Sequence, residues 1–170
     1  MITARNKSKR KDIKMKNTQN YFKTILYASS VNEAYSRVIV SAFAAQLDPT
    51  VEEIADIKTA VSEAVTNCIV HAYRYETDEK KKKIYIEAFY DDEGNFTVTI
   101  KDRGCGIEDI KQAMEPLFTT DAAGERSGMG FAIMESFTDK LKVSSKNGKG
   151  TKVTMTKKLN FKKTLSEKSR

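Results

Sequence analysis

Three polar residues of different chemistry stand four positions apart: the carboxylate Glu63, the amide Asn67 and the imidazole His71. Apolar residues recur at helical spacing beside them, and a helix would stack all three side chains on one face. Such groups are costly to bury between apolar neighbours without a purpose. The pattern therefore indicates a functional face, although a solvated face of an ordinary helix has the same pattern.

Two glycine-containing segments could bring the backbone close to a ligand. Asp102–Gly106 reads Asp-Arg-Gly-Cys-Gly after a predicted strand, where glycine tolerates positive φ and Asp102 can accept a hydrogen bond from an exocyclic amine. Arg126–Gly130 precedes a predicted helix, whose free N–H groups and dipole favour phosphate. A Gly150-Thr151 pair opens the last predicted strand. Each segment alone also fits an ordinary turn or a loop-to-helix transition.

Hydrophobic periodicity and turn residues predict the elements that would position these groups. Strands are predicted over 21–28, 84–90, 95–101, 140–145 and 151–159. Helices are predicted over 30–47, 50–73 and 128–138, with a short helical piece near 108–114 in the long loop 102–127. This order predicts an α+β fold with a layer of helices on a mostly antiparallel sheet.

The two long helices each begin with a capping-box pattern. Ser30 is followed three residues later by Glu33, and Thr50 is followed at the same spacing by Glu53. In a capping box the hydroxyl and the carboxylate each satisfy a backbone N–H group at the start of the helix. Both helices are therefore predicted to be capped by their own side chains.

The charge of the chain is concentrated at its ends. The 170 residues carry a net charge of +7, of which residues 1–16 contribute +6 and residues 157–170 contribute +5, leaving −4 for residues 17–156. We expect a basic disordered tail over 1–16, one folded domain over 17–157 and a second basic tail over 158–170. An acidic folded part does not fit a basic nucleic-acid platform, so direct nucleic-acid binding is not expected.

The two cysteines, Cys68 and Cys105, form no metal-binding spacing and are interpreted as a core residue and a small space-filling residue. The sequence has neither a membrane-length apolar run nor the apolar segment of a secretory signal. A reduced, cytoplasmic protein is the expectation.

Taken in order and spacing, the four segments resemble the nucleotide-binding boxes of the GHKL ATPase superfamily, which includes gyrase and the histidine kinases. The segments Ser62–Asn67, Ile107–Thr120 and Glu125–Phe131 resemble more narrowly the anti-sigma serine kinases of spore-forming bacteria. The resemblance covers roughly residues 17–157. It implies a two-layer α/β sandwich of Bergerat type, with a mixed, mostly antiparallel sheet covered by helices on one face.

The resemblance implies an ATP-Mg²⁺ site. Asp102, helped by Thr151, would bind the adenine amino group, Asn67 would hold Mg²⁺, and Glu63 would be the general base for an attacking serine hydroxyl. Residues 115–127 would be a lid over ATP, with Arg126 neutralising charge on the γ-phosphate. The other implied cofactor-binding residues are His71, Gly104, Gly106, Thr119, Thr120, Ser127, Gly128, Met129 and Gly130.

The resemblance also implies protein partners. The protein would sequester a sporulation sigma factor, phosphorylate a STAS-type anti-anti-sigma protein on serine, and form a homodimer. Arg37 is a candidate anchor for a partner, since arginine is enriched at interface hot spots, and equally an ordinary surface residue. The alternative is a nucleotide-switched sigma-binding module with little kinase activity. A sensor histidine kinase is disfavoured, because the single histidine, His71, falls within the predicted ATP-site helix.

Overall fold

The computed structural model describes residues 18–115 and 128–160. Its strands are β1 (Thr18–Tyr27), β2 (Lys83–Asp91), β3 (Asn95–Lys101), β4 (Lys140–Lys146) and β5 (Gly150–Lys158). Its α-helices are α1 (Val31–Ala44), α2 (Val51–Asn67), α3 (Ile110–Ala113) and α4 (Gly130–Ser136). Short turns of other helix types cover Ala45–Leu47, Cys68–Ala72 and Glu79–Lys81. Every strand and helix predicted from the sequence is present, so the predicted order of elements is confirmed.

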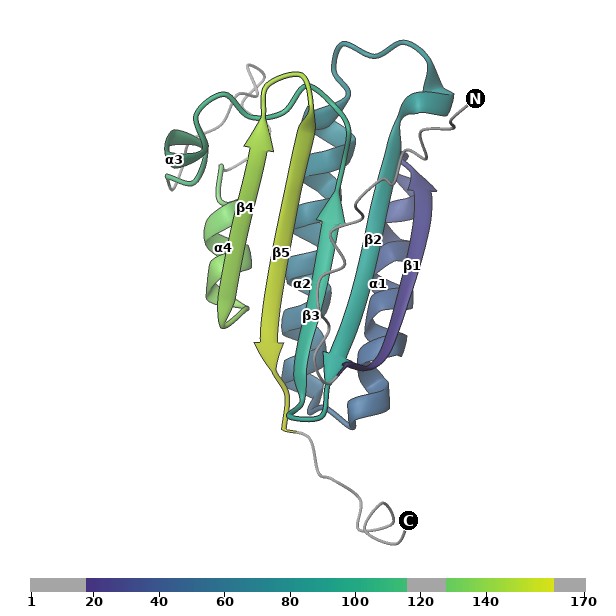
Figure 1. Ribbon diagram of the computed structural model, residues 1–170, viewed down its shortest axis with the longest axis vertical. Helices are drawn as coiled ribbons and strands as arrows, with labels where there is room; N and C mark the ends of the chain where they lie inside the picture. Colours follow the sequence, from purple (N-terminus) through teal and green to yellow (C-terminus); the bar gives the residue numbers. More distant parts are fainter. Residues whose placement is uncertain (1–17, 116–127, 161–170) are drawn as a thin grey trace, which may run out of the picture.

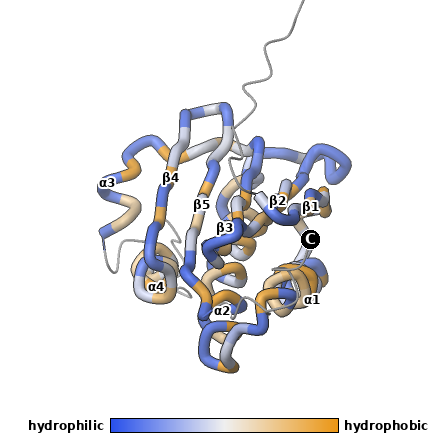
Figure 2. Tube along the Cα trace, turned by 60° about the horizontal axis from the view of Figure 1, so that its bottom comes forward, coloured by the Kyte–Doolittle hydropathy of each residue, from blue (hydrophilic) through white to orange (hydrophobic). Residues whose placement is uncertain are grey.

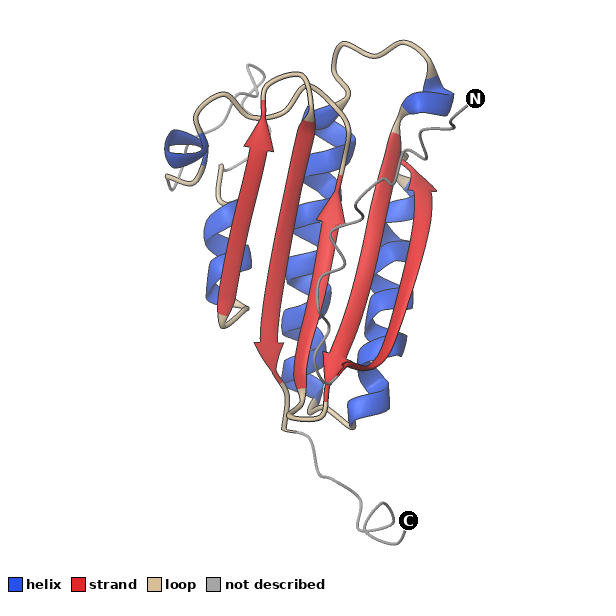
Figure 3. Ribbon diagram, viewed as in Figure 1, coloured by secondary structure: helices blue, strands red, loops and turns tan. Residues whose placement is uncertain are grey.

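The five strands form one sheet in the order β1-β2-β3-β5-β4, and all four pairings are antiparallel. Helices α1, α2 and α4 lie together on one face of this sheet, as Figures 1 and 3 show. The predicted two-layer α/β sandwich is thus confirmed, but the described sheet is wholly antiparallel, where a mixed, mostly antiparallel sheet was expected. Because β3 and β5 pair antiparallel, with Lys101 opposite Lys152, the loop after β3 and the start of β5 meet at one end of the sheet.

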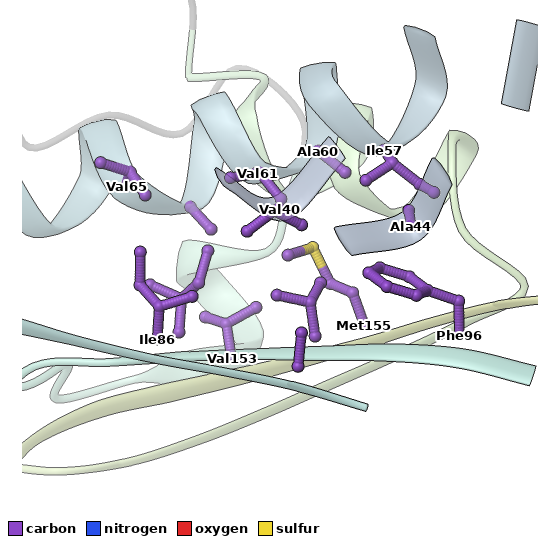
Figure 4. Close-up of a cluster of buried hydrophobic side chains, with 14 of the residues drawn as sticks. Val40, Ala44, Ile57, Ala60, Val61, Val65, Ile86, Phe96, Val153 and Met155 are labelled. Carbon is purple, nitrogen blue, oxygen red and sulfur yellow. The ribbon is translucent and has the colours of Figure 1, made fainter. Parts of the chain in front are cut away.

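The core lies between the helices and the inner face of the sheet (Figure 4). It is built from residues that alternate along the strands and recur at helical spacing on α1 and α2, including Val40, Ile57, Val61, Val65, Ile84, Ile86, Phe96, Ile100, Val153 and Met155. Each such side chain stabilises the fold by about 1.5–3 kcal/mol when fully buried. Figure 2 shows the hydrophobic residues concentrated on α1 and α2, whereas β4 is mostly hydrophilic. This packing fixes α2 against β3 and β5.

The second capping box forms as predicted. The Thr50 side chain accepts a hydrogen bond from the Glu53 N–H at 3.2 Å, and the Glu53 carboxylate accepts one from the Thr50 N–H at 2.8 Å. Two orphan donors at the start of α2 are thereby satisfied. The start of α2 is fixed by its own sequence.

The first capping box was predicted wrongly. Ser30 has helical φ and ψ of −56° and −34°, and its side chain makes no capping hydrogen bond. Glu33 turns to other partners: its Oε1 accepts the Ser62 hydroxyl at 2.6 Å and lies 2.9 Å from Nε of Arg37. The contact between Arg37 and Glu33 is an ion pair, because the Nε–H of Arg37 is not directed at the carboxylate oxygen as a hydrogen bond requires. Glu33 therefore links α1 to α2 because packing offers it stronger partners than the helix end.

The predicted second helix changes its pitch near its end. α-Helical structure stops at Asn67, and Cys68–Ala72 form a π-helical turn. Single π turns inside helices are frequent at functional sites.

No helix in the described part of the chain is long and apolar enough to cross a membrane.

Candidate functional site: a nucleotide-sized cleft

A cleft of about 1440 Å³ opens beside α2, the loop after β3, α3 and the start of α4. Typical ligand pockets measure roughly 300–1,000 Å³, so this cleft has room for a nucleotide. It is lined by most of the predicted site residues: Glu63, Asn67, His71, Asp102, Gly106, Gly128, Met129, Gly130 and Thr151. Gly104 lies within the loop on its wall. Thr119, Thr120, Arg126 and Ser127 lie outside the described residues, as does all of the predicted lid except its first residue, Glu115.

Asp102 follows β3 and is only 3% exposed. Its Oδ1 accepts hydrogen bonds from the backbone N–H groups of Gly104 at 2.8 Å and Thr151 at 3.1 Å. Its own N–H donates to the Thr151 carbonyl at 2.9 Å. Its Oδ2 has a weaker donor, the Cys68 thiol at 3.8 Å. The carboxylate is therefore held by one oxygen, and the other retains capacity to accept a hydrogen bond from a ligand.

Burial dominates the electrostatics of this carboxylate. Burial raises the pKa of Asp102, and the donors Gly104, Thr151 and Cys68 oppose that rise. Burial, followed by the charge of Asp102, raises the pKa of the Cys68 thiol well above its ordinary value. Cys68 is thus a protonated donor in the floor of the cleft. The sequence interpretation placed it in the core, where it does lie, but missed its contact with Asp102.

Neighbouring backbone atoms leave no room for a side chain at the glycines of the cleft wall. A Cβ on Gly104 would lie 1.9 Å from the Ala72 carbonyl oxygen, and a Cβ on Gly106, where φ is 76°, would lie 2.3 Å from the Lys146 carbonyl oxygen. Gly150, with φ of 87°, packs equally tightly against Asp102. The close approach of these glycines is therefore to neighbouring strands and helices. Their contact with a nucleotide stays a prediction.

The other end of the cleft brings α2 against the start of α4. A Cβ on Gly130 would lie 3.0 Å from Oε2 of Glu63 and within 3.6 Å of the Asn67 amide. The carboxylate and amide predicted to act together do lie side by side, facing the glycine-rich start of α4. His71, despite the π turn, lines the same cleft.

This oxygen-rich end fits Mg²⁺ bound with a nucleotide. Mg²⁺ prefers oxygen ligands, keeps several waters, and is usually held by few protein groups together with substrate phosphates. The Asn67 amide supplies such an oxygen at the cleft wall. The described residues contain no group of three or more His, Cys, Asp or Glu that could hold a metal without a nucleotide.

Ser145 is a site residue that the sequence interpretation missed. It lies on β4 directly opposite Thr151 of β5, lines the cleft, and its Oγ accepts the Ile107 N–H at 2.8 Å. A serine in a strand carries no signal of its own. Only the pairing of β4 with β5 brings it to the site.

Arg37 lies outside the cleft, on α1. Its side chain is 42% exposed and paired with Glu33. The same helix exposes the large apolar residues Val31, Tyr35 and Val38. Arg37 therefore belongs to a surface separate from the cleft.

Comparison with known proteins agrees with this geometry. A family model described as a histidine kinase-like ATPase domain matches residues 28–157. The anti-sigma F factor of Caldanaerobacter subterraneus subsp. tengcongensis is 58% identical over 130 residues, covering 76% of this chain and 87% of that protein. The anti-sigma F factor of Clostridium perfringens (strain SM101) is 55% identical over 133 residues, covering 78% and 92%.

Solved structures share the fold at low identity. The RsbU and RsbW domains of Rv1364c from Mycobacterium tuberculosis align with a TM-score of 0.60 and 23% identity, over 82% of this chain and 32% of that chain. The SiaB-SiaC complex from Pseudomonas aeruginosa aligns with a TM-score of 0.57 and 12% identity, over 82% and 91%. The family match, together with relatives more than half identical over most of both chains, shows that this chain belongs to the histidine kinase-like ATPase family and, within it, to the anti-sigma F factors.

Proposed function

We propose that this protein is an ATP-dependent serine kinase that also sequesters a sporulation sigma factor in the cytoplasm. Its phosphorylation substrate would be a STAS-type anti-anti-sigma protein. The observation that carries the proposal is the polarity of the cleft: a buried carboxylate, Asp102, stands at one end and the Glu63–Asn67 pair at the other. A nucleotide has the matching polarity, with an amine-bearing base at one end and phosphates at the other.

Each of the cleft residues would have a distinct role in phosphoryl transfer. Asp102 would accept a hydrogen bond from the adenine amine and fix the base, while Asn67 would hold Mg²⁺, which neutralises phosphate charge when bound. Glu63 would accept the proton of the attacking serine hydroxyl. The serine oxygen would form a bond to the γ-phosphorus while the bond from that phosphorus to the β-phosphate oxygen breaks, which releases ADP. Gly128, Met129 and Gly130 would contact the phosphates, and His71 would lie near them. Thr119, Thr120 and Ser127 would also bind the nucleotide, and Arg126 would neutralise the charge that develops on the γ-phosphate.

The kinase proposal is tested by Glu63→Gln, which keeps the shape of the side chain and removes its basicity. We expect serine phosphorylation of the STAS protein in Mg-ATP to fall by about 100-fold or more, with ATP binding retained. Glu52→Gln, in the exposed first turn of the same helix, is the matched control and should keep full activity. Full-rate phosphorylation by Glu63→Gln would remove Glu63 from catalysis. Sigma capture and ATP binding without phosphoserine in the wild type would favour the nucleotide-switched binding module.

The exposed surface of α1 is a candidate binding site for a protein partner. On α1, Arg37 lies near the exposed Val31, Tyr35 and Val38, a combination typical of protein interfaces. We propose that this surface contacts the sigma factor or the STAS protein. Arg37→Ala should weaken capture of at least one of them while ATP affinity stays unchanged. Unchanged capture of both would refute this role.

We also propose a homodimer. In β1, Phe22 and Leu26 pack against the core, and the residues that alternate with them, Tyr21, Ile25 and Tyr27, are each more than half exposed on the opposite face of the sheet. An apolar patch of this kind on a protein surface marks an interaction site. Light scattering should give about twice the chain mass of 19.2 kDa. A mass of one chain at micromolar concentration would refute the dimer.

A further inference from the structure

The hydroxyl of Ser145 sits at a junction of three polar groups. Its Oγ is 2.8 Å from the Ile107 backbone nitrogen, 2.9 Å from Oγ1 of Thr151 and 3.1 Å from the Gly150 carbonyl oxygen. All four residues belong to the wall of the cleft at its Asp102 end or to the strand that forms it. The junction therefore connects the loop after β3 to the hairpin of β4 and β5.

The chemistry of the partners fixes the direction of each bond. A serine hydroxyl donates one hydrogen bond and accepts two. The Ile107 N–H can only donate and the Gly150 carbonyl can only accept, so Ser145 accepts from Ile107 and donates to Gly150. The third bond must then be donated by Thr151, whose hydrogen points at Ser145. This is the arrangement that satisfies all three contacts at once.

The consequence is that Thr151 presents oxygen lone pairs, and no hydrogen, to a ligand. Asp102 is joined to Thr151 by two hydrogen bonds: its Oδ1 accepts the Thr151 N–H, and its own N–H donates to the Thr151 carbonyl. Its Oδ2 is also an acceptor. The base end of the cleft thus offers two acceptors on adjoining residues. A 6-amino purine carries two N–H donors on one nitrogen, whereas a 6-oxo purine presents an acceptor oxygen that would face both.

We infer that Ser145 is a positioning residue that holds the Thr151 hydroxyl as an acceptor and thereby makes the cleft select 6-amino over 6-oxo purine nucleotides. The inference rests on the proposed ATP site and adds to it the residue that sets the polarity of base recognition. Ser145 itself need not touch the nucleotide.

The test compares the dissociation constants of ATP and inosine triphosphate, which differ at the 6-position of the purine. In Ser145→Ala, Thr151 loses its acceptor and its hydroxyl can rotate to donate to a 6-oxo group. We expect the preference for ATP to fall by about tenfold, the cost of one mismatched hydrogen bond. Ser144→Ala, at an exposed neighbouring position of β4, should leave the preference unchanged.

A merely structural role for Ser145 gives a different result. If Ser145 only clamps Ile107, both affinities fall together and their ratio stays constant, which would overturn the inference. Thr151→Val provides an independent check, because it removes the acceptor and should also reduce the ratio; Ser145→Ala added to Thr151→Val should change the ratio no further. A wild-type protein that binds ATP without preference refutes the inference alone. A wild-type protein that binds neither nucleotide refutes the proposed function as well.

Discussion

Substitution of Gly104 by alanine tests the geometry of the cleft most directly. The added Cβ would lie 1.9 Å from the Ala72 carbonyl oxygen, about 1.5 Å inside the 3.4 Å at which ordinary van der Waals contact begins. The neighbouring Cys105 N–H donates to that same oxygen at 2.7 Å, and the Gly104 N–H donates to Asp102 at 2.8 Å. The loop cannot move away from Ala72 and keep both bonds.

The expected cost follows from this clash. Overpacking of this kind destabilises by about 1–3 kcal/mol, which corresponds to a fall of roughly 3–9 °C in Tm for a domain of this size. Because Asp102 loses an orienting donor, ATP affinity measured by calorimetry should fall by about tenfold or more. The control is Gly148→Ala, where φ is 69° but no atom lies within 4 Å; it should cost about 1 kcal/mol and leave ATP affinity unchanged. Equal ATP affinities in Gly104→Ala and the wild type would refute the reasoning.

Three further predictions concern Asp102 and the helix caps. Asp102→Asn places a donor where the acceptor stood, so titrations should show weaker ATP binding and a relative gain for inosine triphosphate; unchanged selectivity would contradict the role of Asp102. The folded-state pKa of Asp102 is raised, so the stability of the wild type relative to Asp102→Asn should be highest below about pH 4 and fall as pH rises through the folded-state pKa, measured by urea unfolding; the opposite slope would contradict it. Thr50→Ala should lower the free energy of unfolding by about 1 kcal/mol, whereas Ser30→Ala, which removes no capping bond, should have little effect; equal losses would contradict the assigned caps.

The sequence predicted much of this site because its signals are local. The 50–73 helix, the hairpin around Gly94 and the strands flanking Asn147-Gly148 each follow from residue spacing and turn chemistry, and each is present. The helical spacing of Glu63, Asn67 and His71 was enough to place them on one face, and all three line the cleft. The capping pattern at Ser30 failed because Glu33 found a partner on another helix, which no local pattern can show.

The sequence by itself determined the elements, the layer of helices on a sheet and most of the predicted residues that line the cleft, but not Ser145. Periodicity and turn residues act over a few positions, so these features could be predicted locally. Only the tertiary structure decided which groups meet across the cleft. Antiparallel pairing of β3 with β5 joins Asp102 to Thr151, and pairing of β4 with β5 sets Ser145 against that threonine. These contacts span six to 49 residues of chain, and hydrogen-bond direction depends on all partners being present at once. The polarity of the base-binding end is therefore a property of the folded sheet.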